Sequence, residues 1–349
     1  MGVIKLPGSS LEFFKSNLDE IFETGSLAEG PWNQRLSDLA QTYCGTTCAI
    51  PTTSNGSGLM ALLHLYKEYR HRTEVLIQSN TMYGVKTLVN AAGLTLSGFI
   101  DCNPLTLMPS LRDVETALED RSNTATLIVL LSHIGGIINP EMDAIASLCQ
   151  ERGVTVIEDC AHSFGATLNG KHSGAFGDAG AYSFYATKAV PAGEGGIVVT
   201  NDEEIGRALT DYVKYDRFNQ LMNIGVNIRM SETQALLVYS VAKEVGEIID
   251  NKSKIAARYV EACQELGIRY IDQEAQYTRG NYYKFIVLAE NGSIADALPE
   301  LKTMTSKVYD YCLGKSHIIT TNHACLPIWY DQPPEVAEGV VAELTMSRA

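Results

Sequence analysis

The sequence has no apolar run long enough to cross a bilayer, and its first residues show no basic start followed by an apolar core. Neither a membrane span nor a secretory signal is therefore expected. Basic side chains are also scarce, because 27 Lys and Arg stand against 41 Asp and Glu, for a net charge of −14. A chain this acidic gains little from neutralising a phosphate backbone. These features predict a cytoplasmic protein without membrane or nucleic-acid partners.

Several common functional signatures are missing as well. The eight cysteines are scattered over 349 residues without a second Cys or His pair at zinc-ligand spacing, so reduced thiols and no metal site are expected. Residues 314–316 resemble the end of a P-loop, but Tyr309 stands where the first glycine is required. The glycines of 174–180 do not form the dinucleotide fingerprint, and G-x-S-x-G does not occur. The sequence thus does not support an NTPase, a nicotinamide enzyme or a serine hydrolase.

The first two thirds of the chain alternate short apolar runs with amphipathic periods. The runs predicted as strands are Thr47–Pro51, Glu74–Gln78, Leu94–Asp101, Thr126–Leu131, Val154–Glu158, Ala179–Phe184 and Gly196–Val199. Helical periods lie between them, for example at Gly58–Arg70, Leu107–Glu119 and Asn139–Arg152. This alternation predicts an α/β fold with a mostly parallel, seven-stranded sheet covered by helices on both faces.

The last third of the chain predicts a smaller α+β domain. A long helical stretch at Ser231–Leu266 leads into it, and a strand at Tyr282–Leu288 follows. Helices are predicted at Ser293–Leu301 and Pro334–Leu344. We therefore divide the chain into residues 1–235, the N-terminal segment with the large domain, and residues 236–349, the small C-terminal domain.

One predicted strand ends in two adjacent carboxylates, Glu158 and Asp159. Ligands of open α/β sheets bind beyond the carboxyl ends of the strands. Asp159 is therefore placed where it could hold the N–H of a pyridinium ring, which keeps that ring an electron acceptor. A helix N-cap is the alternative interpretation of the same residue.

A later strand delivers a hydroxyl and then a lysine. Ser183 is followed by Lys188 and by the glycine-rich turn 193–196. A lysine in apolar surroundings has a lowered pKa and can form an imine, although most lone lysines are solvated surface groups.

A third segment, Pro51–Leu59, is a turn of small polar residues before an amphipathic helix. Such a turn can offer backbone N–H groups to a phosphate, and a plain capped turn explains it equally well. In chain order the three segments are a phosphate cup, a pyridinium partner and an imine lysine. These are the components that pyridoxal 5′-phosphate (PLP) requires.

From about residue 25 to 232 the sequence resembles the DegT/DnrJ/EryC1/StrS family of sugar aminotransferases, a branch of the fold type I PLP enzymes. Residues 24–31 look like the family's N-terminal substrate loop. The segments that carry the likeness are Ser54–Gly58, His133–Gly136, Glu158–Ala166, Ser183–Lys188, Gly193–Gly196 and Gly225–Met230.

The resemblance implies roles for particular residues. Lys188 and Asp159 would be catalytic: Lys188 holds the cofactor as an imine and moves a proton, and Asp159 binds the pyridinium nitrogen. The implied cofactor-binding set is Gly56, Ser57, Gly58, Met82, Asp159, His162, Ser183, Lys188 and Asn227. Within this set, Ser57, Ser183 and the amides around Gly58 would hold the phosphate.

The resemblance also implies partners. Asn227 would reach the phosphate of a neighbouring subunit, which makes the expected unit a homodimer with shared active sites. The amino donor would be glutamate and the acceptor a keto group on a nucleotide-linked sugar, as in polysaccharide or antibiotic biosynthesis.

The sequence departs from the family pattern at three places. His162 stands where the family has Gln beside the phenolic oxygen of the cofactor. Met82, followed by Tyr83, stands where an aromatic residue stacks on the cofactor ring, so either of the two could cover it. The acceptor loop is shortened over about residues 307–325. A cyclitol or another small keto acceptor, a PLP enzyme without transfer such as a sugar dehydratase, and a non-catalytic protein are therefore the alternatives.

Overall fold

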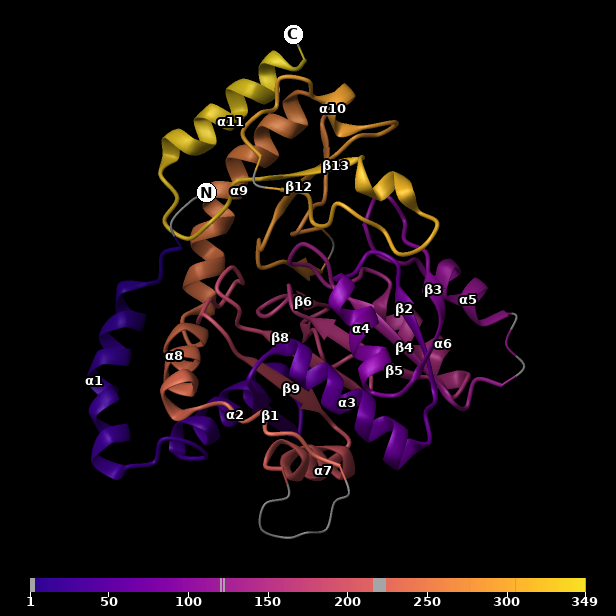
Figure 1. Ribbon diagram of the computed structural model, residues 1–349. Coiled ribbons are helices and arrows are strands. Elements are labelled where there is room, and N and C mark those ends of the chain that lie inside the picture. Colours follow the sequence, from indigo (N-terminus) through magenta and orange to yellow (C-terminus); the bar gives the residue numbers. More distant parts are fainter. Residues whose placement is uncertain are drawn as a thin grey trace.

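The computed structural model describes residues 4–119, 121, 123–215, 224–275, 277–304 and 306–348. A seven-stranded sheet lies at its centre (Figure 1). The strands are β1 (Cys48–Thr52), β2 (Glu74–Gln78), β3 (Thr95–Ile100), β4 (Leu127–Ser132), β5 (Thr155–Cys160), β8 (Ala179–Ser183) and β9 (Gly196–Thr200). Their spatial order is β1-β9-β8-β5-β4-β2-β3. Only β9 runs against its neighbours, so the predicted, mostly parallel sheet is confirmed.

Helices cover both faces of this sheet. One face carries α3 (Asn55–Arg70), α4 (Tyr83–Ala91) and α7 (Glu203–Val213). The other carries α1 (Gly8–Thr24), α2 (Pro31–Cys44), α5 (Leu111–Glu119), α6 (Met142–Glu151) and α8 (Glu232–Ala242). Successive strand residues face opposite sides. Val75 and Ile77 thus join the first core, whereas Leu76 joins the second.

The C-terminal part of the chain forms its own layer (Figure 1). An antiparallel sheet of β10 (Arg269–Tyr270), β12 (Phe285–Leu288) and β13 (His323–Leu326) packs with α9 (Val245–Glu265) and α11 (Pro334–Met346). Shorter elements are β6 (Thr167–Leu168), β7 (Lys171–His172), β11 (Thr278–Arg279), α10 (Ile294–Ala297) and the 3-10 helix η1 (His317–Thr320). The predicted boundary between residues 235 and 236 falls within α8 and stays a prediction.

No helix within the described residues is long and apolar enough to span a bilayer.

The predicted helix Ser231–Leu266 is wrong in its continuity, because the chain breaks it at Lys243 and Glu244 into α8 and α9. The two halves bury different surfaces: α8 packs against α1 and α2, whereas α9 packs against α11 and β10. A single straight helix could not contact both sets of partners. The break therefore coincides with the change of packing partners, and Gly246 follows it in the first turn of α9.

A buried carboxylate joins the start of α2 to the start of α8. The Glu232 side chain is fully buried and accepts hydrogen bonds from the backbone N–H groups of Gly30 (2.9 Å), Trp32 (2.7 Å) and Asn33 (3.1 Å). The first N–H groups of a helix have no partner within it. Glu232 supplies partners to the first turn of α2, and its charge is favourable at that end of the helix.

We expect Glu232→Gln to lower the free energy of unfolding by about 2–3 kcal/mol, because an amide NH₂ would then face backbone donors in a buried site. Denaturant or thermal unfolding measures the change. Glu203→Gln is the matched control. The Glu203 side chain is 72% exposed and, within the described residues, pairs with Arg207 at 3.4 Å, so its effect should stay below about 0.5 kcal/mol. Equal losses in the two variants would contradict the role of Glu232.

Candidate active site

Lys188 lies in the tight connection between β8 and β9. The Phe184 N–H donates to the Gly195 carbonyl (2.9 Å) and the Ala186 N–H donates to the Gly193 carbonyl (3.0 Å). These bonds continue the β8–β9 ladder beyond the strands and close the loop at its base. The loop therefore holds Lys188 at the carboxyl end of β8, the edge at which α/β sheets bind ligands.

The Lys188 amine is partly buried and makes no hydrogen bond or ion pair with any described residue. Burial lowers the pKa of Lys188 to about 8, and the nearby Asp159 carboxylate opposes part of that shift. The Nζ atom lies 4.8 Å from the centre of the Tyr283 ring. Lys188 is thus an amine of which an appreciable fraction is neutral near neutral pH, as a nucleophilic lysine requires.

Asp159 is the penultimate residue of β5 and accepts hydrogen bonds from three segments. Its carboxylate accepts hydrogen bonds from Asn55 Nδ2 (3.0 Å), the Ala161 N–H (3.1 Å) and Ser132 Oγ (3.2 Å). The side chain is 5% exposed. Burial raises the pKa of Asp159, whereas these hydrogen bonds and the charge of Lys188 lower it. Two of its three donors come from other segments, and no helix of the described residues begins directly after Asp159, so a plain helix cap does not describe it.

The segment 51–59 lies beside this carboxylate. Helix α3 begins at Asn55, so Gly56, Ser57 and Gly58 belong to its first turn and not to a preceding loop. Ser54 caps the helix by accepting from the Ser57 N–H (3.1 Å). The N-terminus of α3 is therefore a place where backbone amides and the Ser57 hydroxyl can meet an anion.

Gly196 allows β9 to pack closely against the start of α3. A Cβ atom at this position would collide with the backbone of Ser54 and Asn55. Ser183, the last residue of β8, pairs with Gly196 in the ladder and is almost fully buried. The predicted phosphate ligands Ser57 and Ser183 thus come from two segments that are packed backbone to backbone.

His162 follows Asp159 in the turn after β5. Its Nδ1 atom is buried and has no hydrogen-bond partner among the described residues. Burial, with help from Lys188 and Lys284, keeps the pKa of His162 well below its usual range, so the ring is neutral. Its ring centre lies 4.5 Å from that of Tyr283 and 6.1 Å from that of Tyr309.

Met82 and Tyr83 start helix α4 at the surface, where they are 48% and 52% exposed. The Tyr83 N–H donates to Tyr311 Oη (2.6 Å). None of the contacts recorded for Met82 or Tyr83 involves His162 or Asp159. The aromatic rings beside His162 come from Tyr283 and Tyr309 instead, and which residue covers the cofactor ring stays a prediction.

Asn227 is exposed in the segment that follows the undescribed residues 216–223. Its side chain makes no hydrogen bond with any described residue. The neighbouring Ile228 carbonyl accepts from the Thr53 N–H (2.9 Å), which places the segment beside the start of α3.

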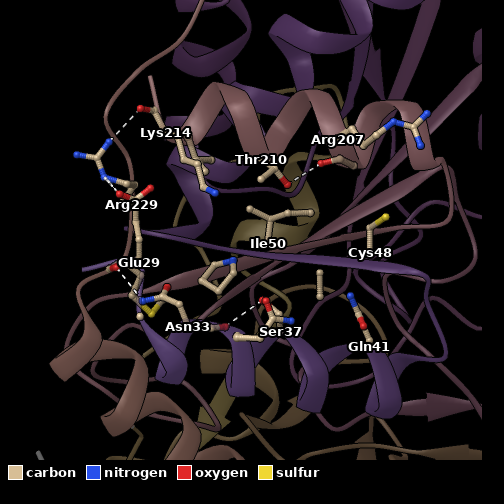
Figure 2. A pocket seen from close by; sticks show the side chains of 17 residues that line it. Glu29, Asn33, Ser37, Gln41, Cys48, Ile50, Arg207, Thr210, Lys214 and Arg229 are labelled. Atoms are coloured by element: carbon tan, nitrogen blue, oxygen red, sulfur yellow. Dashed lines mark hydrogen bonds and ion pairs between the residues drawn. The ribbon is translucent and has the colours of Figure 1, made fainter. Parts of the chain in front are cut away.

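Two other features fall outside this site. Figure 2 shows a cavity of about 340 Å³ lined by Glu29, Asn33, Ile50 and Arg229, among others. The catalytic candidates Lys188 and Asp159 do not line it. It lies between α2, β1 and α7, next to the predicted substrate loop.

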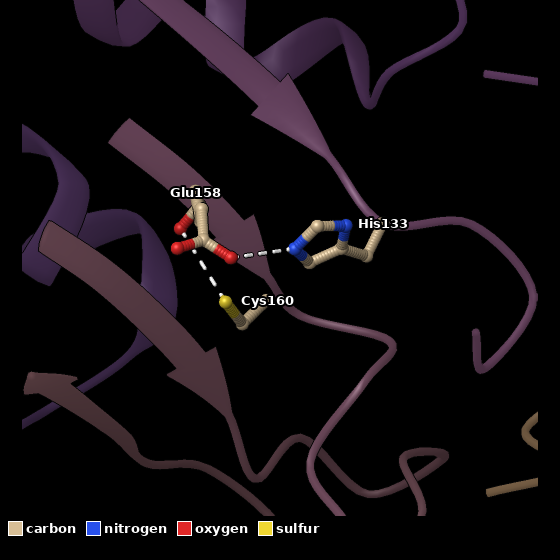
Figure 3. A group of neighbouring side chains, drawn as sticks. All are labelled: His133, Glu158 and Cys160. Carbon is tan, nitrogen blue, oxygen red and sulfur yellow. Dashed lines mark hydrogen bonds and ion pairs between the residues drawn. The ribbon is translucent and has the colours of Figure 1, made fainter. Parts of the chain in front are cut away.

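The second feature is a buried cluster of His133, Glu158 and Cys160 (Figure 3). Glu158 accepts from His133 Nε2 (2.8 Å) and from the N–H groups of Gly174 (2.8 Å), Phe176 (2.8 Å) and Gly177 (2.7 Å). Burial raises the pKa of the Cys160 thiol well above its usual range. A cation would have to displace the donors of a fully occupied carboxylate, so the cluster is structural.

Sequence reasoning missed Asn55, Ser132, Asn281, Tyr283 and Tyr309 as parts of the site. Ser132 carried a usable signal, because it is the polar residue that ends an apolar strand. Asn281 Nδ2 donates to the carbonyls of His162 and Phe164, both at 2.8 Å. No periodicity or motif predicts that a residue 119 positions away in the chain should hold this turn.

The arrangement fits PLP on three observations. The buried His162 Nδ1 has no partner among the described residues, the Asp159 carboxylate is buried at the end of β5, and the Lys188 amine near it is unpaired within the same described part of the chain. Gly56, Ser57, Gly58, Ser183 and Lys188 lie along the same edge.

The sequence profile of the DegT/DnrJ/EryC1/StrS aminotransferase family matches residues 10–344. GDP-perosamine synthase of Escherichia coli O157:H7 is 29% identical over 216 residues, which are 60% of this chain and 57% of that protein. UDP-N-acetyl-3-dehydro-alpha-D-glucosamine 3-aminotransferase of Acidithiobacillus ferrooxidans is 27% identical over 265 residues, 75% of this chain and 70% of that protein.

The fold has close counterparts among solved structures. A DegT DnrJ EryC1 StrS aminotransferase from Brucella abortus superposes with a TM-score of 0.85 over the full length of both chains, at 19% identity. At this identity the likeness concerns the fold.

The lowered pKa of Lys188 can be tested on the protein without cofactor. Only the neutral amine reacts with acetic anhydride, so labelling of Lys188 should rise as the pH passes through about 8. Free N-acetyl-lysine should follow its ordinary pKa of about 10.4. In Asp159→Asn the midpoint should fall further, because the carboxylate that favours the ammonium form is gone. Peptide mass spectrometry measures each profile, and a midpoint that stays or rises in Asp159→Asn would contradict the coupling.

Proposed function

The chain belongs to the DegT/DnrJ/EryC1/StrS aminotransferase family, and from that premise we propose that it moves an amino group from glutamate to the keto carbon of a nucleotide-linked sugar. The observation that carries the proposal is Lys188, an amine with a pKa lowered to about 8 beside the buried carboxylate of Asp159. Two relatives named for GDP- and UDP-linked sugars support the acceptor class.

The cofactor of the family is PLP, which when bound acts as an electron sink for the carbon that carries the amino group. Asp159 would hold the proton of the ring nitrogen, and its hydrogen bonds to Asn55, Ser132 and Ala161 orient it for this task. The first turn of α3, with Ser57, and Ser183 would bind the phosphate. The buried Nδ1 of His162 would meet the phenolic oxygen.

Lys188 would hold and move the proton of the reaction. Its Nζ must be neutral to take a proton from the donor carbon and charged to return one. A group with a pKa of about 8 exists in both forms near neutral pH, which is the condition for efficient general acid–base catalysis. The rings of Tyr283 and Tyr309 lie beside His162 and would exclude water from that side of the site.

We expect Lys188→Ala to reduce amino transfer by about 1,000-fold or more, because it removes both the nucleophile and the proton carrier. Transfer from glutamate to a panel of nucleotide-linked keto sugars is the assay. Lys254→Ala removes an exposed lysine from α9 and should leave the rate unchanged. Near-normal turnover in Lys188→Ala, with circular dichroism showing a folded protein, would reject the assignment.

We further propose that Asn227 serves the site of a neighbouring subunit, since its amide is exposed and unpaired among the described residues. Asn227→Asp should repel a bound phosphate and, like Lys188→Ala, be nearly inactive alone. Refolding the two variants together should restore about a quarter of the wild-type sites, because half of randomly formed dimers are mixed and each has one intact site. A refolded wild-type sample is the control, and a mixture no more active than its components would exclude shared sites.

A further inference from the structure

A small cavity of about 60 Å³ adjoins Lys188. Lys188, Tyr283 and Lys252 line it together with the apolar side chains of Ile248, Ile328 and Trp329. None of the described residues that line it is acidic. Lys5, which also borders the cavity, is already paired with Asp331 at 2.6 Å. The cavity therefore has cationic and apolar walls without an internal counter-charge.

Lys252 is the unusual residue of this cavity. It projects from α9 and is only 5% exposed, yet it forms no hydrogen bond or ion pair with any described residue. Its neighbours on the helix are occupied elsewhere: Asn251 accepts from the Asp331 N–H (2.9 Å) and Ser253 donates to Glu274 (2.8 Å). Lys252 is thus an amine enclosed by the protein and without a partner in the described part of the chain.

Enclosure of an unpaired ammonium group is unfavourable, because water no longer solvates it. Burial, together with the charge of Lys284, lowers the pKa of Lys252 to about 7. An anion that entered the cavity would supply the missing partner and would stabilise the ammonium form. The amine is therefore suited to bind an anion rather than to support the fold.

We propose that Lys252 and this cavity form a carboxylate subsite that takes an acidic group of the amino donor. The cavity is small and admits a carboxylate. The apolar walls suit the methylene groups of a short acidic amino acid, and Lys188, where the donor's amine must arrive, lines the same cavity. This inference rests on the proposed amino transfer and assigns its donor side to particular residues.

Glutarate tests the subsite apart from the reaction, because it has two carboxylates and no amine to transfer. We expect calorimetry on the cofactor-loaded protein to show glutarate binding that is weakened about tenfold or more in Lys252→Met, the loss of one charge-assisted hydrogen bond. Lys254→Met removes the same charge from the exposed face of α9 and should bind glutarate like the wild type. Lys252→Arg should retain part of the affinity.

A second measurement on the wild type does not depend on how well a variant folds. Glutarate should protect Lys252 from acetic anhydride, as measured by peptide mass spectrometry, while Lys254 stays reactive. Unchanged labelling of Lys252, or normal glutarate affinity in Lys252→Met, would overturn the proposal. Inorganic phosphate serves as a competing probe, and protection of Lys252 by phosphate as strong as that by glutarate would show a general anion site and overturn the assignment to the donor.

The two proposals fail in different ways. If glutarate binds through Lys252 but glutamate transfers no amino group, the proposed function fails and the carboxylate subsite stands. If amino transfer from glutamate proceeds at the normal rate and with the normal KM in Lys252→Met, the subsite fails and the function stands.

Discussion

A carboxylate buried at the end of a central strand must be given hydrogen-bond donors, and the site around Asp159 is organised by that requirement. Its donors come from the start of α3, the end of β4 and the turn after β5. Ser132 is the ladder partner of Asp159, and Gly196 lets β9 pack against the start of α3, which carries Asn55. The hydrogen bond from Asn55 to Asp159 therefore also fixes the first turn of α3, which carries Ser57, beside the strand ends that lead to Lys188.

The alternation of a β-strand explains why two adjacent acids of β5 have different tasks. Side chains of consecutive strand residues point to opposite faces. Glu158 points to one face and accepts four donors, including three backbone N–H groups of the segment 174–177. Asp159 points to the other face, where its donors leave the carboxylate next to Lys188. Glu158 thus stabilises the fold, whereas the Asp159 carboxylate is placed to bind a ligand.

The sequence predicted the strands and the strand-end residues because both depend on local patterns. Short apolar runs gave the seven strands, and the polar residues after them gave Asp159 and Lys188. Contacts between distant segments gave no such signal. The division between α8 and α9 depends on two separate packing surfaces, and Asn281 reaches His162 from the C-terminal layer. The start of α3 was placed too late because the Ser54 cap turns an apparent loop into the first helical turn.

The charged groups of the site and the aromatic rings that shape it therefore come from different parts of the chain. Lys188 and Asp159 belong to the strand ends of the large sheet, where His162 adds no charge because its pKa lies well below its usual range. The rings beside His162, Tyr283 and Tyr309, come from the C-terminal third. Substitutions there can reshape the surroundings of His162 without touching the hydrogen bonds of Asp159. That separation is why the charged residues follow from motifs along the chain, whereas the shape of the site depends on packing that motifs do not encode.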